Sequence, residues 1–155
     1  MIKKMAAGNW KMNGILDSLK EIERLQATHS NSDIDIVICP PVPLLLPARK
    51  KAPHLLIGAQ DCHQKVSGAH TGDISASLLK DIGAAAVIIG HSERRQAHAE
   101  SSALIQQKAS AALTAGLTAI ICIGETLEQR QAEETLTVLK DQLEKSLPET
   151  ATAHN

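Results

Sequence analysis

Apolar runs of strand length alternate five times with helix-like stretches along the 155-residue chain, at intervals of about 30 residues. This alternation is typical of repeated βα units, whose strands lie parallel in one sheet. The strands that it predicts are 5–9, 34–39, 55–60, 84–90 and 117–123. The sequence therefore predicts an α/β fold of about five parallel βα units, forming a single domain over residues 1–155.

The helices between these strands are predicted from apolar periodicity and from turn residues. A proline is tolerated in the first turn of a helix, so the second helix is expected to start at or near Pro47. The first helix is expected to place Leu19, Ile22 and Leu25 on one face, and a short helix is expected at 75–80. The next helix is capped by Ser101 or Ser102 and carries on one face Ile105, Ala109, Ala112 and Leu113. A single long helix is expected after Gly124, with leucines in register at Leu136, Leu139, Leu143 and Leu147.

The fourth predicted strand runs directly into a group of ionisable side chains. Residues 84–89 are apolar throughout, as expected of a strand that is buried on both faces, and Gly90 ends the run. We expect Ser92 to cap the next helix and Glu93 to lie against the positive end of its dipole. His91 would lie beside the same positive end, which disfavours its protonation. A neutral imidazole at this place can donate a hydrogen bond to a carbonyl oxygen.

Polar side chains follow other strands as well. Asn9 and Lys11 come after the first strand, Gln60 and Asp61 after the third, and Glu125 after the fifth. Parallel strands all end at the same edge of a sheet, so these side chains are expected to converge at the C-terminal face of a βα barrel. The sequence predicts that this face is the functional site.

Composition excludes several classes of partner. The 16 Lys and Arg residues nearly balance 17 Asp and Glu, with no basic block, which argues against nucleic acid. No apolar run approaches the roughly 18 residues of a membrane span, and the N-terminus does not resemble a secretory leader, so a cytoplasmic protein without membrane contact is expected. The three cysteines occur singly, as in a reducing compartment. The seven histidines show no metal-ligand spacing, so neither metal nor cofactor is expected.

Five motifs resemble those of the triosephosphate isomerase family, in the same order and over essentially the whole chain. They are 8–13 (GNWKMN), 58–61 (GAQD), 68–75 (GAHTGDIS), 89–95 (IGHSERR) and 122–126 (CIGET). The resemblance implies part of a TIM (β/α)8 barrel. It also implies an enzyme of glycolysis and gluconeogenesis that interconverts dihydroxyacetone phosphate and glyceraldehyde 3-phosphate through an enediolate.

The resemblance assigns roles to individual residues. His91 matches the electrophile, Lys11 the cation that faces the substrate, and Asn9 a neighbouring polar contact, while Glu93 matches a carboxylate near Lys11 and Cys122 a small buried residue. These roles agree with the chemistry, because enolisation places negative charge on the carbonyl oxygen and a fixed donor and an ammonium group stabilise that charge. A neutral histidine at a helix N-terminus is a known property of this family.

The same resemblance implies a homodimer. The segment 64–71 would reach into the partner subunit, with Thr71 nearest to the partner's site.

The family's glutamate base, its lid and its phosphate-binding loops match no part of the 155 residues, so we expect this truncated chain alone to be inactive or nearly so. Five strands would also leave two unpaired edges and an exposed apolar inner face. Exposure of roughly 1,000 Å² of apolar surface would forgo about 25 kcal/mol of burial, more than the ~5–15 kcal/mol stability of a typical domain. A second copy, making a homo-oligomer, or the last helix or tail is expected to cover that surface.

Simpler interpretations remain open. His91 can be a structural histidine, Lys11 a solvated lysine, Glu93 part of a charged helix start, and Cys122 plain core. The alternative function is a stable half-barrel without isomerase activity. Such a module would bind a phosphate-bearing ligand weakly or pair with another half-barrel.

Overall fold

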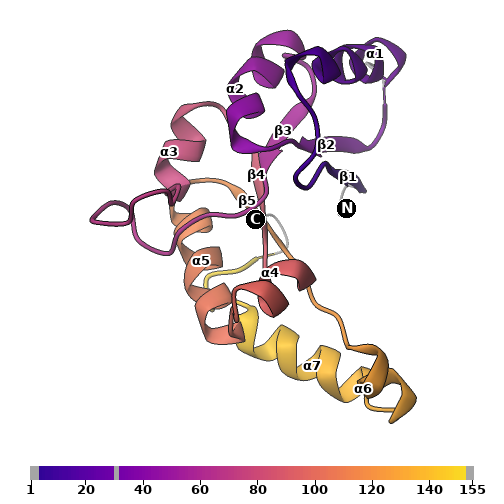
Figure 1. The fold of residues 1–155 in the computed structure, drawn as a ribbon, viewed down its shortest axis with the longest axis vertical. Helices are drawn as coiled ribbons and strands as arrows, with labels where there is room; N and C mark the ends of the chain where they lie inside the picture. The colour runs from indigo at the N-terminus through magenta and orange to yellow at the C-terminus, as the bar shows by residue number, and fades with distance from the viewer. Residues whose placement is uncertain (1–3, 30–31, 153–155) are drawn as a thin grey trace.

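The computed structural model describes residues 4–29 and 32–152, and in it five parallel strands form one curved sheet in the order β1-β2-β3-β4-β5 (Figure 1). The strands are β1 (Met5–Asn9), β2 (Asp35–Cys39), β3 (Leu56–Ala59), β4 (Ala86–Ile89) and β5 (Thr118–Ile121). Each pairs in parallel with the next strand along the chain. The predicted α/β fold of five parallel βα units is confirmed.

Helical segments follow every strand. They are the 3-10 turn η1 (Leu16–Ser18) and the helices α1 (Leu19–His29), α2 (Val42–Lys51), α3 (Ala76–Asp81), α4 (Ser92–Ala97), α5 (Ser102–Thr114), α6 (Leu127–Gln131) and α7 (Thr135–Ser146). Ser75 and Ser101 cap α3 and α5 by accepting hydrogen bonds from backbone amides at 3.2 Å. Among the described residues, no helix combines the length and the apolar character that crossing a bilayer requires.

The second helix begins at Val42, so the predicted start near Pro47 is wrong. Pro43 lies in the first turn, where a proline is favourable, and Pro47 lies inside the helix. The carbonyl that Pro47 leaves without a helical donor belongs to Pro43, at the helix start, so the disruption is confined to the first turn. Full burial of Leu45 compensates for this loss.

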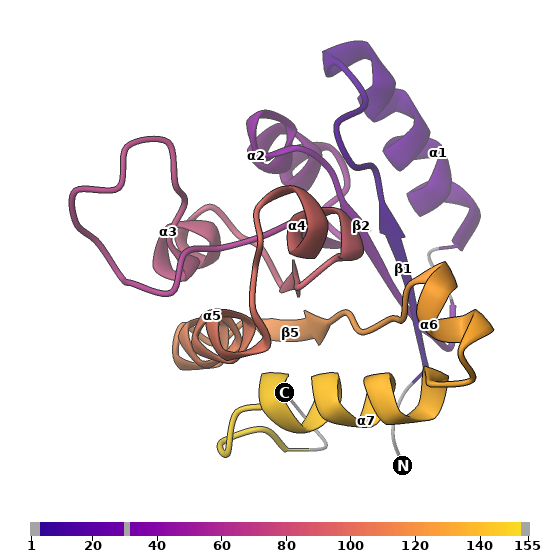
Figure 2. The same cartoon turned by 60° about the horizontal axis from the view of Figure 1, so that its bottom comes forward.

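The single long helix predicted after Gly124 is also wrong, because the segment forms α6 and α7. Glu133, between them, has φ +60°, a left-handed conformation that ends a helix. Leu136 and Leu143 are 81% and 45% exposed, so the leucine register does not mark a buried face. Helix α7 packs along α5 rather than across the inner face of the sheet (Figure 2).

The main core lies between the sheet and its helices and is aliphatic. Its largest fully buried side chains include Leu19, Ile22, Leu45, Ile57, Leu79, Ile89 and Ile105. The predicted inner faces of α1 and α5 are present there, although Leu113 of α5 is only partly buried. This core fixes the positions of the strand ends.

A smaller cluster lies on the inner face of the sheet. Val37, Cys39, Ala86 and Ile88 are at most 4% exposed, because the curvature of the sheet encloses them. The expected exposure of the inner face is therefore wrong for the central strands. It holds near the edges, where β1 and β5 each lack one neighbour among the strands described and Met5 is 42% exposed.

Candidate functional site

His91, and not Ser92, is the N-cap of α4. The Glu93 backbone amide donates a hydrogen bond to the ring Nδ1 of His91 at 3.3 Å. The helix already begins at Ser92, so the hydroxyl predicted to cap it lies one residue too late. Because Nδ1 offers its lone pair to an amide, the neutral ring carries its proton on Nε2. The side chain is 23% exposed, so that N–H can donate to a ligand oxygen.

The Glu93 carboxylate is paired with a lysine from another strand end and lies beside the imidazole. Its Oε1 lies 2.9 Å from Lys11 Nζ, and its Oε2 lies 3.4 Å from His91 Nδ1. The hydrogen bond from Lys11 lowers the pKa of the Glu93 carboxyl, which keeps it ionised. The Lys11 and Glu93 side chains are 50% and 57% exposed, so solvent and small ligands reach the pair.

Lys11 has a strained backbone that neighbouring side chains hold in place. Its φ is +52°, which costs of order 1–3 kcal/mol for a residue other than glycine. Its amide donates to Asn9 Oδ1 at 2.8 Å, and its carbonyl accepts from Gln60 Nε2 at 2.9 Å. Gln60 Nε2 also donates to the Cys39 carbonyl at 2.8 Å. The ends of β1, β2 and β3 therefore position this lysine together.

Gln60 received no role from the sequence beyond its place after a strand. Its two hydrogen bonds to carbonyls of different segments depend on the register of the sheet, which no local pattern reveals. Its strand-end position and its place in the motif 58–61 were the signals that could have identified it.

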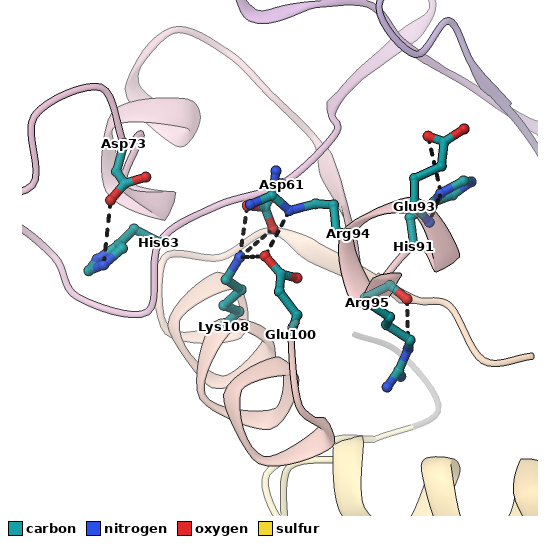
Figure 3. Close-up of polar contacts among 10 residues, drawn as sticks. Asp61, His63, Asp73, His91, Glu93, Arg94, Arg95, Glu100 and Lys108 are labelled. Atoms are coloured by element: carbon teal, nitrogen blue, oxygen red, sulfur yellow. Dashed lines mark hydrogen bonds and ion pairs between the residues drawn. The ribbon is translucent and has the colours of Figure 1, made fainter. Parts of the chain in front are cut away.

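Asp61 does not join this group, contrary to the expected convergence. Its carboxylate accepts from Lys108 Nζ at 2.8 Å and lies 3.0 Å from Arg94 Nη2. Glu100, 3% exposed, completes the cluster, with Oε1 at 2.6 Å from Lys108 and 2.8 Å from Arg94. Figure 3 shows the four side chains together, apart from His91 and Glu93. The partly buried Arg94 of α4 and the buried Lys108 of α5 draw the aspartate away from the strand ends.

The two carboxyls of this cluster have opposite pKa shifts. Burial raises the pKa of Asp61 by more than Lys108 and Arg94 lower it. Burial alone would also raise the pKa of Glu100, but hydrogen bonds and charge from Lys108 and Arg94 hold it below its ordinary value. The cluster thus attaches α4 to α5 through ionised groups, and the lowered pKa keeps the Glu100 carboxyl negatively charged.

Glu125 also points away from the strand-end group. Its Oε1 accepts from Arg130 Nε at 2.8 Å and lies 3.5 Å from Thr135 Oγ1. Its own backbone amide and Arg130 lower the pKa of the carboxyl. Glu125 therefore joins the last turn of α6 to the start of α7 and does not approach His91 through these contacts.

Arg95 lies behind the histidine and joins four segments. Its guanidinium donates to the Gly90 carbonyl at 2.9 Å, the Cys122 carbonyl at 3.0 Å, and the hydroxyls of Ser102 and Ser146 at 3.2 and 3.3 Å. From sequence, Arg95 was part of a charged helix start. Its position right after a buried strand was the available signal.

A small pocket of about 240 Å³ opens between the ends of β4 and β5. It is lined by Gly90, His91, Ser92, Arg95, Cys122, Ile123 and Gly124. Burial raises the pKa of the Cys122 thiol, so this side chain is neutral. The pocket offers His91 a space of small-molecule size.

Thr71 lies in the long connection between β3 and α3, which projects from the body of the chain (Figure 1). Its side chain is exposed.

The chain is similar to known proteins of one family. The family model of triosephosphate isomerase matches residues 4–155. Similar proteins include the triosephosphate isomerases of Ruegeria sp. (strain TM1040), 53% identical over 100% of this chain and 63% of that protein, and of Ruegeria pomeroyi, 54% identical over 96% and 60%. The crystal structure of triosephosphate isomerase from Bartonella henselae has a TM-score of 0.94 at 49% identity, covering 99% of this chain and 65% of that one. The chain thus spans 60–65% of the length of these relatives.

The buried cluster yields a stability prediction. Replacing one member of a buried ion pair leaves its partners uncompensated, so Glu100→Gln should lower the free energy of unfolding by about 3–5 kcal/mol in urea denaturation at neutral pH. The control Glu21→Gln breaks an exposed pair with Arg24 and should cost less than about 1 kcal/mol.

The stability loss expected for Glu100→Gln depends on pH. Because the pKa of Glu100 in the fold is below its ordinary value of 4.5, its stabilisation is present above that pH and is lost as the pH falls further. The difference between parent and Glu100→Gln should shrink in acid. Equal losses for Glu100→Gln and Glu21→Gln at neutral pH would contradict the role of the cluster.

Proposed function

Because the chain belongs to the triosephosphate isomerase family, we propose that it provides the electrophilic side of a site that interconverts dihydroxyacetone phosphate and glyceraldehyde 3-phosphate. The observation that carries the proposal is the hydrogen bond from the Glu93 amide to His91 Nδ1, which leaves Nε2–H as the donor. The pocket beside this ring supports the same assignment.

The proposed chemistry uses two donors of different charge. Isomerisation removes a proton from carbon and builds negative charge on the carbonyl oxygen. His91 Nε2–H donates to this oxygen, and the Lys11 ammonium adds positive charge that stabilises the enediolate more than the ketone. His91 and Lys11 are the proposed catalytic residues. The proton transfer needs no cofactor.

Glu93 and Asn9 have supporting roles in this proposal. Glu93 holds Lys11 Nζ at 2.9 Å and supplies the amide that orients His91. Asn9 binds the Lys11 amide through Oδ1, which leaves its side-chain NH2 group to contact substrate.

We propose further that a polypeptide of residues 1–155 alone does not complete the reaction. A base must take the carbon-bound proton, and the two carboxylates near the ends of β4 and β5 are engaged elsewhere. Glu93 is paired with Lys11, and Glu125 with Arg130. Neither is held opposite His91 by the contacts described, so the donor side has no partner base.

A coupled assay of triose phosphate isomerisation tests this proposal. The purified 155-residue chain, His91→Gln and the matched control His98→Gln, which changes an exposed histidine at the end of the same helix, are compared at high protein concentration. All three should show the same background rate. Turnover in the parent and in His98→Gln that disappears in His91→Gln would show that the 155 residues contain a complete site.

A role in assembly has separate support, because β1 and β5 each lack a neighbour among the described strands. Met5 and Ile123 are 42% and 37% exposed near these edges. We propose that a second copy covers them in a homo-oligomer. The contact that the family resemblance assigns to the segment 64–71, with Thr71 nearest to the partner's site, remains a proposal, and a cytoplasmic location remains a prediction.

Sedimentation velocity tests the assembly proposal. At micromolar concentration the chain should sediment as a species heavier than its own 16.5 kDa. A compact monomer under these conditions would refute the proposal and would indicate that the sheet edges tolerate solvent.

A further inference from the structure

Two histidines and an aspartate meet at the base of the projecting connection between β3 and α3. One possible ligand atom from each of His63, His70 and Asp73 lies within 4.8 Å of the others. The two imidazole rings are tilted by 34° to each other, with centroids 4.1 Å apart. His63 faces Asp73 (Figure 3), and its Nε2 lies 3.8 Å from Asp73 Oδ2. These side chains line a pocket of about 600 Å³. His63 and Asp73 have no part in the functions proposed above, and His70 lies in the segment 64–71 that is proposed to contact a partner.

Backbone hydrogen bonds fix this arrangement. The His63 amide donates to the Ile74 carbonyl at 2.8 Å, and His63 forms an isolated parallel bridge with Ser75. The Asp73 amide donates to the His70 carbonyl at 3.0 Å, which closes a turn and brings these two side chains together. The three donors therefore come from both arms of the connection and face one another before any ligand binds.

We propose that His63, His70 and Asp73 form a site for a divalent first-row metal ion, with Zn²⁺ as the reference ligand. Two imidazole nitrogens and one carboxylate oxygen suit Zn²⁺, which then takes water as its fourth ligand. The neighbouring Cys62 does not take part, because it is buried and its thiol faces the Lys108 carbonyl at 3.7 Å. The site is a nitrogen and oxygen site without sulfur.

Binding requires a modest contraction. Tetrahedral Zn²⁺ with bonds of about 2.0 Å places its donors roughly 3.3 Å apart. The His63–Asp73 separation of 3.8 Å must therefore shorten by about 0.5 Å, and no separation by more than about 1.5 Å. The Asp73 side chain is 56% exposed and can turn toward the rings. His63 is only 15% exposed and provides the fixed point.

Coordination also moves a proton within His63. Its Nδ1 accepts from the Lys65 amide at 3.1 Å, so the neutral ring carries its proton on Nε2. When Nε2 binds the metal, that proton is lost and Nδ1 gains one, with no net release. The Lys65 amide then donates to water instead of to Nδ1, which is possible because this hydrogen bond is exposed to solvent. A bound metal would join the two arms and order the segment between them.

Equilibrium dialysis against ZnCl₂ with elemental analysis tests the site on the chelator-treated 155-residue chain. One Zn²⁺ per chain is expected. His63→Gln, His70→Gln and Asp73→Asn should each weaken binding by more than the roughly 10–100-fold that loss of an outer-shell partner costs. His54→Gln, which changes an exposed histidine outside the cluster, should bind as the parent does.

Two further readouts separate the outcomes. The circular dichroism spectrum of each variant must match that of the parent. If His63→Gln does not fold, Asp73→Asn still tests the site, because the Asp73 side chain is exposed. The visible spectrum of the Co²⁺-loaded chain should lack a thiolate charge-transfer band. Binding that survives all three substitutions, or that shows the thiolate band, overturns the proposal. These measurements do not involve isomerase activity, so their failure leaves the proposed function unaffected.

Discussion

The junction of β4 and α4 depends on one hydrogen bond, from the Glu93 amide to the ring nitrogen of His91. A side-chain cap of this kind ordinarily comes from a serine, threonine or aspartate oxygen. When an imidazole takes that place, the cap also selects the tautomer of the ring. The hydrogen bond that starts the helix therefore also orients the Nε2–H donor of His91. Gly90 allows the turn, because its φ is +73° and a Cβ there would lie 2.8 Å from Ile105 Cδ1.

Helix α4 is held by polar contacts in place of apolar burial. None of its residues is buried, yet Arg94 reaches the carboxylates of Asp61 and Glu100, and Arg95 reaches the Gly90 and Cys122 carbonyls. Hydrogen bonds that involve a charged group are worth about 1.5–3 kcal/mol each, so these two side chains can fix a helix of six residues. The position of His91 therefore depends on the contacts of Arg94 and Arg95 as well as on its own cap.

The sequence was sufficient for the architecture because apolar period and turn residues act locally. All five strands and the serine cap of α5 follow from such signals, with Ser101 as the cap among the two serines that the sequence offered. Failures occurred where a local signal competed with a longer-range one. The regular spacing of leucines predicted one helix where Glu133, in a left-handed conformation, separates α6 from α7. Pro47 predicted a helix start, but α2 includes Leu45, which is fully buried, and begins before the proline.

Contacts between distant segments were the least predictable part of the site. Asp61 follows a strand, as expected of a site residue, but a buried lysine 47 positions later draws its carboxylate away. His63, His70 and Asp73 match no ligand spacing, and only the folding of both arms of their connection brings them together. Partners of this kind depend on tertiary structure, which motif spacing alone does not encode.

The most direct test of the account is the protonation of the His91 ring, read from a long-range proton–nitrogen NMR spectrum of the ¹⁵N-labelled chain at neutral pH, with His91→Gln to assign the signals. The account predicts that Nδ1 is unprotonated and that the proton of the neutral ring lies on Nε2. A ring protonated on Nδ1 would contradict it, because Nδ1 could then not accept from the Glu93 amide and the cap would be absent.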